Sequence, residues 1–158
     1  MRCIVIFILW CVWYNVSHMS DYGEINLIKI EASDEFWAIM DELVDDGSGF
    51  VANRGMILDA YSMGNLFGLC ASGVVAGAKL ECESIFCDVG KCLIPCFCVK
   101  DGCRAILIWT HTRARNRGFA KRMVELLEIT TAYFPIPESV GFWEKCGINM
   151  TINYSGAA

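Results

Sequence analysis

The chain has 158 residues, which is enough for one domain with a real core and too few for two comfortable domains. Its formal net charge is −5, which argues against a generally basic chain that binds nucleic acid. Hydrophobic residues make up 55% of the sequence, partly because of one unbroken apolar stretch near the N-terminus.

Residues 1–18 contain this apolar stretch, Cys3–Tyr14. It is shorter than the roughly 20 residues of a spanning helix, but it has the length of a signal-peptide core. Only Arg2 precedes it, and no small-residue cleavage site follows it. We therefore expect residues 1–18 to be an extension or upstream start outside the domain. A weak signal or anchor and an extra edge strand are the less favoured alternatives. A cytoplasmic domain over residues 19–158, without stable membrane insertion, would begin at Met19.

A strand and an acidic helix are expected next. Residues Ile25–Ile30 alternate enough to form a strand. Ser33 is typical of a helix N-cap and Gly47 of a helix end, and apolar residues recur between them at helical spacing. No lysine or arginine lies between Lys29 and Arg54, where seven carboxylates occur instead: Glu31, Asp34, Glu35, Asp41, Glu42, Asp45 and Asp46. Such a run is usually a solvated helix face.

The middle of the chain predicts a loop followed by consecutive hairpins. Residues 47–65 are interrupted by glycines and predict a loop with a short helix. Residues 66–83 and residues 84–102 each predict a hairpin. The expected turns are Ser72-Gly73, Asp88–Lys91 and Lys100–Gly102.

Helices and strands alternate in the last third of the chain. A strong strand is expected over Cys103–Thr112. The clearest helix, Arg117–Glu128, has one apolar stripe. A short strand over Ile129–Phe134, a short helix over Glu138–Gly147 and a last strand over Ile148–Tyr154 complete the chain. We therefore expect one mixed α/β (α+β) domain that is rich in antiparallel strands.

Six of the ten cysteines lie between Cys82 and Cys103. The cluster contains no C-x-x-C pair and no nearby histidine, so the usual zinc spacing is absent. Cys96 and Cys98 flank Phe97 as alternating strand residues do. We expect reduced, buried cysteines that behave as small hydrophobic residues, with zinc or disulfides as the lesser alternative.

Three arginines follow the strong strand: Arg113, Arg115 and Arg117. Between Arg104 and Arg122 lie six of the thirteen basic residues of the chain. A strand, a tight turn and a helix start bring free backbone amides together, and the helix dipole adds positive potential there. This arrangement predicts an anion site, and Gly118 would let a phosphate approach the backbone closely.

Residues Arg115–Ala120 read R-x-x-G-x-A, which resembles the acetyl-CoA signature Q/R-x-x-G-x-G/A of the GNAT superfamily of N-acetyltransferases. In that superfamily the signature follows a strand, here Ala105–Thr112, and opens a long helix. Residues Ser139–Ile148, "SVGFWEKCGI", resemble a downstream helix of the superfamily, and Leu66–Glu81 is similar to its second and third strands. The resemblance covers roughly Ile25–Tyr154.

The resemblance implies a mixed, mostly antiparallel sheet with flanking helices and a splayed pair of central parallel strands. It also implies an enzyme that moves the acetyl group of acetyl-CoA to a primary amine by direct attack. The acceptor would be a small cationic amine or a lysine side chain, and the first acidic helix would border its cleft. Acetyl-CoA would be the co-substrate, with no metal, and a homodimer is left open.

The resemblance also implies which residues would contact acetyl-CoA. The backbone amides of residues 117–121 would hold the pyrophosphate, and the end of the strong strand would lie along the pantetheine. The whole set comprises Trp109, Thr110, His111, Thr112, Arg115, Asn116, Arg117, Gly118, Phe119, Ala120, Lys121 and Trp143.

The catalytic acid and base depart from the pattern of the superfamily. Many members have an acidic tyrosine where this chain has Trp143, which cannot donate a proton at neutral pH. Tyr133 or Ser139 would then protonate the thiolate, unless it leaves unprotonated. The strong strand lacks a carboxylate, so the base would be Glu83 or a neighbour, Glu81, with a water chain or His111 as alternatives. We assign Glu83 and Tyr133 as the catalytic candidates.

Two other functions compete with this one. A catalytically degenerate GNAT fold would bind acyl-CoA or a partner without turnover. A nucleic-acid or membrane surface could instead bind the basic turn. The net negative charge and the short extent of the basic segment favour a small polyanion, so we expect no nucleic-acid partner.

Overall fold

The computed structural model describes residues 24–46, 54–71, 85–88 and 91–151. Over these residues the chain forms a mixed sheet of seven strands with four α-helices and two 3₁₀ turns. The strands are β1 (Ile25–Lys29), β2 (Leu66–Ala71), β3 (Phe86–Asp88), β4 (Lys91–Asp101), β5 (Arg104–Thr110), β6 (Thr131–Tyr133) and β7 (Asn149–Thr151). The helices are α2 (Ser33–Asp45), α3 (Arg54–Ser62), α4 (Phe119–Leu126) and α5 (Val140–Lys145), and the 3₁₀ turns are η3 (Thr112–Ala114) and η4 (Pro137–Ser139).

The sheet has an antiparallel part and a parallel part. Its order is β1-β2-β4-β5-β6-β7, with β3 paired to β4. The pairs β1–β2, β2–β4, β3–β4 and β4–β5 are antiparallel. The pairs β5–β6 and β6–β7 are parallel, because α4 and α5 carry the chain back across the sheet between them.

The pairing of β5 with β6 stops early. Arg104 pairs with Thr131 and Ala105 with Ala132, and there the ladder ends. On its other side β5 has a register shift, since Ala105 pairs with Lys100 but Leu107 pairs with Val99. The strand therefore bulges at the point where its parallel partner leaves it. Bulges bend a strand and terminate pairing in this way, so β5 has an open edge beyond Ala105 within the described residues.

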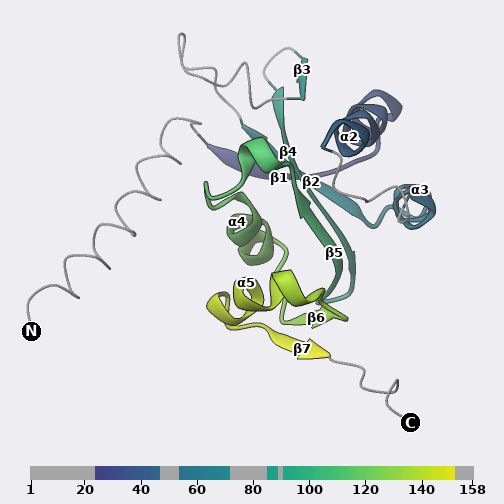
Figure 1. Ribbon diagram of the computed structural model, residues 1–158. Coiled ribbons are helices and arrows are strands. Elements are labelled where there is room, and N and C mark those ends of the chain that lie inside the picture. Colours follow the sequence, from purple (N-terminus) through teal and green to yellow (C-terminus); the bar gives the residue numbers. More distant parts are fainter. Residues whose placement is uncertain (1–23, 47–53, 72–84, 89–90, 152–158) are drawn as a thin grey trace, which may run out of the picture.

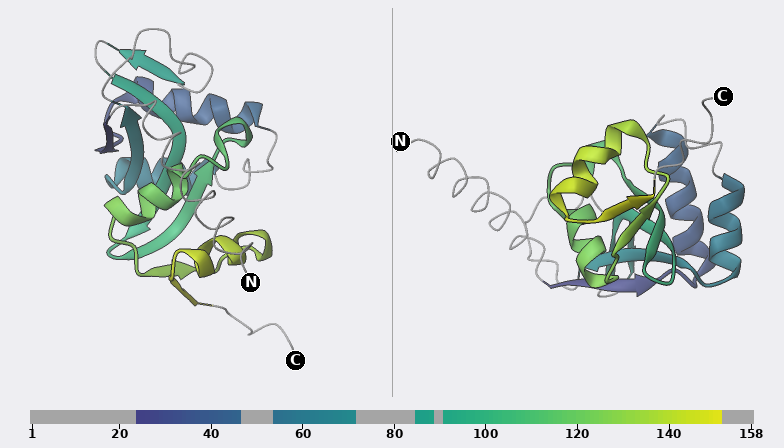
Figure 2. Two further views of the ribbon diagram at one scale, coloured as in Figure 1. Left: turned by 90° about the vertical axis from the view of Figure 1, so that its left-hand side faces the viewer. Right: turned by 90° about the horizontal axis from the view of Figure 1, so that it is seen from below.

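Helices cover both faces of the sheet. In Figures 1 and 2, α2 and α3 lie on one face, and α4 and α5 lie on the other. One hydrophobic cluster joins α2 and α3 to Phe97 and Trp109 of the sheet. A second cluster joins α4 to the opposite face and contains Phe119, Met123 and Trp143. Alternate side chains along β4 and β5 therefore pack into two separate hydrophobic cores, one on each face of the sheet.

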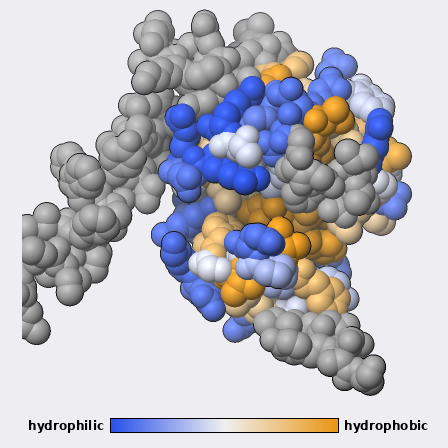
Figure 3. All heavy atoms as spheres, in the orientation of Figure 1, coloured by the Kyte–Doolittle hydropathy of each residue, from blue (hydrophilic) through white to orange (hydrophobic). Residues whose placement is uncertain are grey.

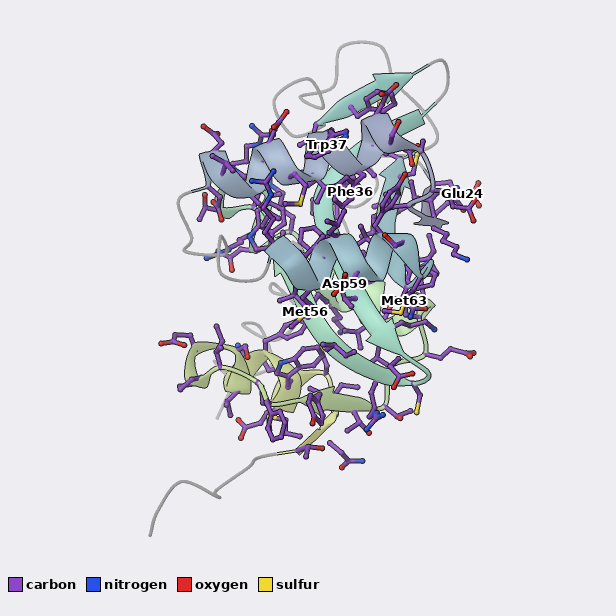
Figure 4. All side chains as sticks on the ribbon, turned by 90° about the vertical axis from the view of Figure 1, so that its right-hand side faces the viewer. Glu24, Phe36, Trp37, Met56, Asp59 and Met63 are labelled. Atoms are coloured by element: carbon purple, nitrogen blue, oxygen red, sulfur yellow. The ribbon has the colours of Figure 1, made fainter. Side chains whose placement is uncertain are left out.

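The first layer is formed by two helices that lie side by side in Figure 4. Phe36 of α2 stacks on Tyr61 of α3, with ring centroids 4.4 Å apart. Trp37 lies at the outer side of α2 and is half exposed. Met56 and Met63, which lie along α3 in the same figure, are also exposed. The packing of this layer against the sheet therefore depends on the inner stripe of each helix.

The structure confirms the expected mixed α/β fold. The turn between β3 and β4 pairs Asp88 with Lys91, as expected, and the next turn contains Gly102 at φ 57°. Two helix starts differ from the expectation. Ala32, not Ser33, is the N-cap of α2, and α4 begins at Phe119 after Gly118 rather than at Arg117.

Some expectations fall outside the described residues. The N-terminal segment 1–18, the second strand of the hairpin over residues 66–83, and the end of the helix at Gly47 are among them. The last strand is described only over β7. The 3₁₀ turn η3 was not expected. None of the helices described here has the length and apolarity needed to cross a bilayer.

Replacing Phe97 by alanine should destabilise the protein by about 3–5 kcal/mol, because the ring is fully buried against Trp109. Chemical denaturation would measure the change. The matched substitution at Phe134, whose ring is 41% exposed, should cost at most about 1 kcal/mol. Equal losses at the two positions would contradict the assignment of this core.

Candidate functional site

The segment between β5 and α4 has the backbone shape expected of an anion-binding loop. Asn116 and Gly118 adopt positive φ values of 62° and 85°. The amide of Arg122 donates to the carbonyl of Gly118 at 2.9 Å, which closes the first turn of α4. The amides before that bond belong to the N-terminal turn of α4, where the helix dipole favours an anion. A Cβ at Gly118 would meet nothing within 4 Å, so this side of the loop is open.

Arg113 and Arg115 have carboxylate partners at the end of α2. A terminal nitrogen of Arg113 lies 2.9 Å from Oε2 of Glu42. A terminal nitrogen of Arg115 lies 3.9 Å from Oδ2 of Asp46, and its Nε donates to the carbonyl of Thr110 at 3.0 Å. The negative groups beside the arginines are therefore the acidic residues at the end of α2.

This partnership explains the charge pattern of α2. Acidic residues at a helix C-terminus face the negative end of the helix dipole, and α2 has no basic residue in its last turn. The compensating cations come from the turn after β5. The acidic run is accordingly not one solvated face, because the side chain of Asp46 is fully buried and that of Glu42 is 18% exposed, whereas that of Asp45 is 78% exposed.

Asp46 also holds the turn η3 directly. Its Oδ1 accepts a hydrogen bond from the amide of Thr112 at 3.1 Å and another from the hydroxyl of Thr112 at 2.7 Å. Sixty-six positions separate these residues in the sequence. The end of α2 and the start of the loop are thus joined by hydrogen bonds to a buried carboxylate, a strong class of contact.

His111 is buried at the centre of this cluster. Its Nδ1 accepts a hydrogen bond from the amide of Arg113 at 3.1 Å, so Nδ1 carries a lone pair and the ring proton belongs on Nε2. Nε2 lies 3.5 Å from Glu42, 3.7 Å from Asp46 and 3.9 Å from Asp45. A ring in this tautomer points a proton, not a lone pair, at the carboxylates. The geometry therefore does not support His111 as a general base.

The same geometry does not favour a metal ion. Ligand atoms of Glu42, Asp45 and His111 lie within 4.8 Å of one another. Coordination by Nε2 would need a lone pair there, and moving the proton to Nδ1 would break the bond from the Arg113 amide. The guanidinium of Arg113 beside Glu42 would also repel a cation.

Several backbone groups at the end of β5 are already occupied. The carbonyl of Thr110 accepts from Arg115, and the amide of His111 donates to the carbonyl of Pro95 at 2.9 Å. The amide of Thr112 donates to Asp46. The segment from Trp109 to Thr112 was expected to lie along a pantetheine arm. Because these backbone groups are occupied, only the first part of the segment can present backbone groups to a ligand at the open edge of β5. The open edge continues backward to Ile106.

Hydrophobic residues gather near the middle of the face shown in Figure 3, with hydrophilic residues above them. The residues of β5 beyond the bulge are apolar and only partly buried: Ile106, Leu107 and Ile108. Partial burial of a central strand follows from the missing neighbour on its open edge. The candidate site therefore comprises this edge and the loop that follows β5 in the chain.

The remaining predicted residues are distributed around this site. Trp109 and Trp143 are both buried, one in each hydrophobic cluster. Tyr133 is 40% exposed, and the guanidinium of Arg104 lies 5.8 Å from the centre of its ring. The hydroxyl of Ser139 donates to the carbonyl of Ile136. Residues 72–84, which include Glu81 and Glu83, lie outside the described residues.

The cysteines of β4 are buried within the sheet. Cys92, Cys96 and Cys98 carry no disulfide. Burial raises the pKa of the Cys96 thiol and that of the Cys98 thiol to about 12. The hydroxyl of Thr110 lies 3.2 Å from the sulfur of Cys96, as a donor to it. For these residues the prediction of reduced cysteines acting as core side chains is confirmed.

Comparison with protein-family models, with curated proteins and with solved structures finds no match to this chain. The assignment of a function consequently depends on the geometry of the site and on the sequence resemblance.

Sequence reasoning missed the carboxylates that complete the site. Glu42 and Asp46 were placed on the acidic helix, without a link to the arginines. One signal pointed to the link. Glu42 and Asp45 in the last turn of a helix and Asp46 at its C-cap, with no basic residue in that turn, are stabilised by cations from elsewhere in the fold.

Thiol accessibility should separate the cysteines. With iodoacetamide at about pH 8, Cys103, which is exposed, should be alkylated before the other cysteines whose burial is described, while Cys96 and Cys98 should stay unmodified in the native protein. Their thiolates are disfavoured by burial, and the thiolate is the reactive form. Mass spectrometry of native and denatured samples measures the difference. Native labelling of Cys96 at the rate seen for Cys103 would contradict the described packing.

Proposed function

We propose that the chain is an acetyl-CoA-dependent N-acetyltransferase that acts on a primary amine. The observation that carries the proposal is the open space beside Gly118, in the loop after a strand whose edge has no pairing partner beyond Ala105 within the described part of the chain. This pairing of an anion site with an apolar open edge suits a ligand that has phosphates at one end and a thioester at the other. It agrees with the resemblance of residues 115–120 to the GNAT signature.

The pyrophosphate would bind at the start of α4. The amides of residues 119–121 and the helix dipole favour an anion there, and Gly118 leaves room for its approach. Arg117 and Lys121 would add charge at the same place. Arg113 and Arg115 would contribute less directly, since Glu42 and Asp46 already hold them.

The thioester would lie along the open edge of β5. In the reaction the lone pair of a neutral acceptor amine forms a bond to the acetyl carbonyl carbon, and the carbonyl oxygen becomes an oxyanion. Backbone amides at the edge are suited to stabilise that charge. When the C–S bond breaks, its electron pair leaves with the thiolate of CoA. The amine nitrogen loses one proton, and the thiolate or solvent takes up one.

The residues proposed to transfer these protons are the two candidates from the sequence, one as the base and one as the acid. Glu83 is the candidate base. Tyr133 is the candidate acid, and its hydroxyl-bearing ring is accessible at 40% exposure. The acceptor would be a small cationic amine or a lysine side chain, drawn by the net negative charge of the chain.

A second candidate function is acyl-CoA binding without turnover. Trp143, which replaces the tyrosine of many members, is 4% exposed and cannot reach a thiolate in the site as an acid. His111 presents a proton instead of a lone pair to its surroundings. Both observations favour acyl-CoA binding without turnover over an enzyme that uses Trp143 as its acid or His111 as its base. A nucleic-acid surface is less favoured, because carboxylates hold Arg113 and Arg115.

Calorimetric titration with CoA and with acetyl-CoA at two salt concentrations tests the proposal. We expect stoichiometric binding with a Kd in the micromolar range, weakened only modestly by salt. Acetylation of polyamines or lysine peptides would then separate the enzyme from the binding module. A folded protein that binds neither ligand would contradict both candidates. Affinity for oligonucleotides that collapses with added salt would instead support the nucleic-acid surface.

Replacing Gly118 by glutamate should abolish CoA binding, because a carboxylate would stand where the pyrophosphate approaches. Gly118→Ala is the matched control, since it carries the same unfavourable φ of 85° without the charge. The alanine variant should lose about 1 kcal/mol of stability and should keep measurable CoA affinity. Unchanged affinity in a folded glutamate variant would remove the loop from the site.

A further inference from the structure

The contact between α2 and η3 joins two parts of the site that are far apart in the sequence. Asp46 is the C-cap of α2, and its own amide is held by carbonyls of the helix. Its side chain is fully buried, and both hydrogen bonds from Thr112 converge on one oxygen, Oδ1. Both bonds end on Thr112, which lies six residues before Gly118 in the chain, so Asp46 contacts the segment at its start.

Thr112 is connected to the loop by the backbone hydrogen bonds of η3. Its carbonyl accepts the amide of Arg115 at 3.4 Å, and the carbonyl of His111 accepts the amide of Ala114 at 2.9 Å. These two bonds form the 3₁₀ turn. The residue after Arg115 is Asn116, whose φ of 62° lies in the left-handed region that asparagine, unlike most residues, adopts readily. The turn held by Asp46 therefore leads directly into the reversal of the chain before α4.

We propose that Asp46 is a positioning residue that fixes η3 through its two hydrogen bonds with Thr112 and so sets the affinity of the loop for the phosphates of CoA. The proposal rests on the proposed function for its ligand, but not for its structural part. Asp46 accepts both hydrogen bonds of Thr112 with the oxygen that an asparagine also offers. Its neighbour Asp45 has the same charge, is largely exposed and makes no contact with Thr112 among the hydrogen bonds of the described residues.

Three single variants test the role of Asp46 by calorimetric titration with CoA. Asp46→Ala removes the acceptor and should raise the Kd for CoA about tenfold, which corresponds to the loss of about one hydrogen bond to a charged group. Asp46→Asn keeps an acceptor oxygen and should stay within about threefold of the wild type, with Asp45→Ala closer still. Asp46→Asn as weak as Asp46→Ala, or Asp45→Ala as weak as Asp46→Ala, would overturn the proposal.

A double-mutant cycle approaches the contact from the other partner, in case Asp46→Ala alone folds poorly. Thr112→Val removes the hydroxyl donor and nearly preserves the shape of an exposed side chain. If both residues act through their shared contact, Thr112→Val in the Asp46→Ala background should cost little more affinity than Asp46→Ala alone. Fully additive losses would overturn the proposal.

Hydrogen exchange of the ligand-free protein supplies a readout that needs no CoA. Asp46→Ala and Thr112→Val should speed exchange of the amides of residues 113–118 about tenfold or more, and should leave the amides of β4 unchanged. Equal protection of the loop in wild type and variants would contradict the positioning role. A wild type that binds no CoA but shows the expected exchange would overturn the proposed function and leave the structural role of Asp46 standing.

Discussion

The contact between the end of α2 and the turn after β5 is the constraint on which the candidate site depends. It brings carboxylates that are unfavourable at the end of their own helix to arginines that would repel one another in a tight turn. The arginines stabilise the carboxylates at the end of α2, and the carboxylates reduce the repulsion between the arginines. The result is a turn in which Arg113 and Arg115 are paired with carboxylates, followed by a helix start with open space beside Gly118.

Two irregularities of the central strands give the site its shape. In β4 the pairing with β2 shifts beyond Gly68, and the residues released there include Pro95, whose carbonyl receives the amide of His111. In β5 the bulge after Ala105 coincides with the end of the pairing with β6. Proline is tolerated inside a sheet at such bulges because it has no amide to donate. The irregularity in β4 provides the carbonyl that holds the end of β5, and the bulge in β5 leaves the edge of that strand open.

Much of the fold could be predicted from the sequence, because each element has a local signal. Alternation marked β4 and β5, the apolar stripe marked α4, and Gly102 marked the turn between the two strands. The ion pairs between α2 and the arginine turn could not be derived, since they join residues about 70 positions apart. The tautomer of His111 was equally inaccessible, because it depends on a neighbouring amide. Local patterns predict elements, whereas the site arises where the elements meet.

The buried thiols of β4 have a consequence for how long a molecule of this protein survives. While the sheet is closed, Cys96 and Cys98 are protected by burial and stay protonated. Once the sheet opens, the same side chains become ordinary thiols at close spacing, and an oxidant can join them to each other or to another chain. Such bonds would block the return of β4 to its two cores. Unfolding would therefore become a one-way process wherever oxidation is faster than refolding.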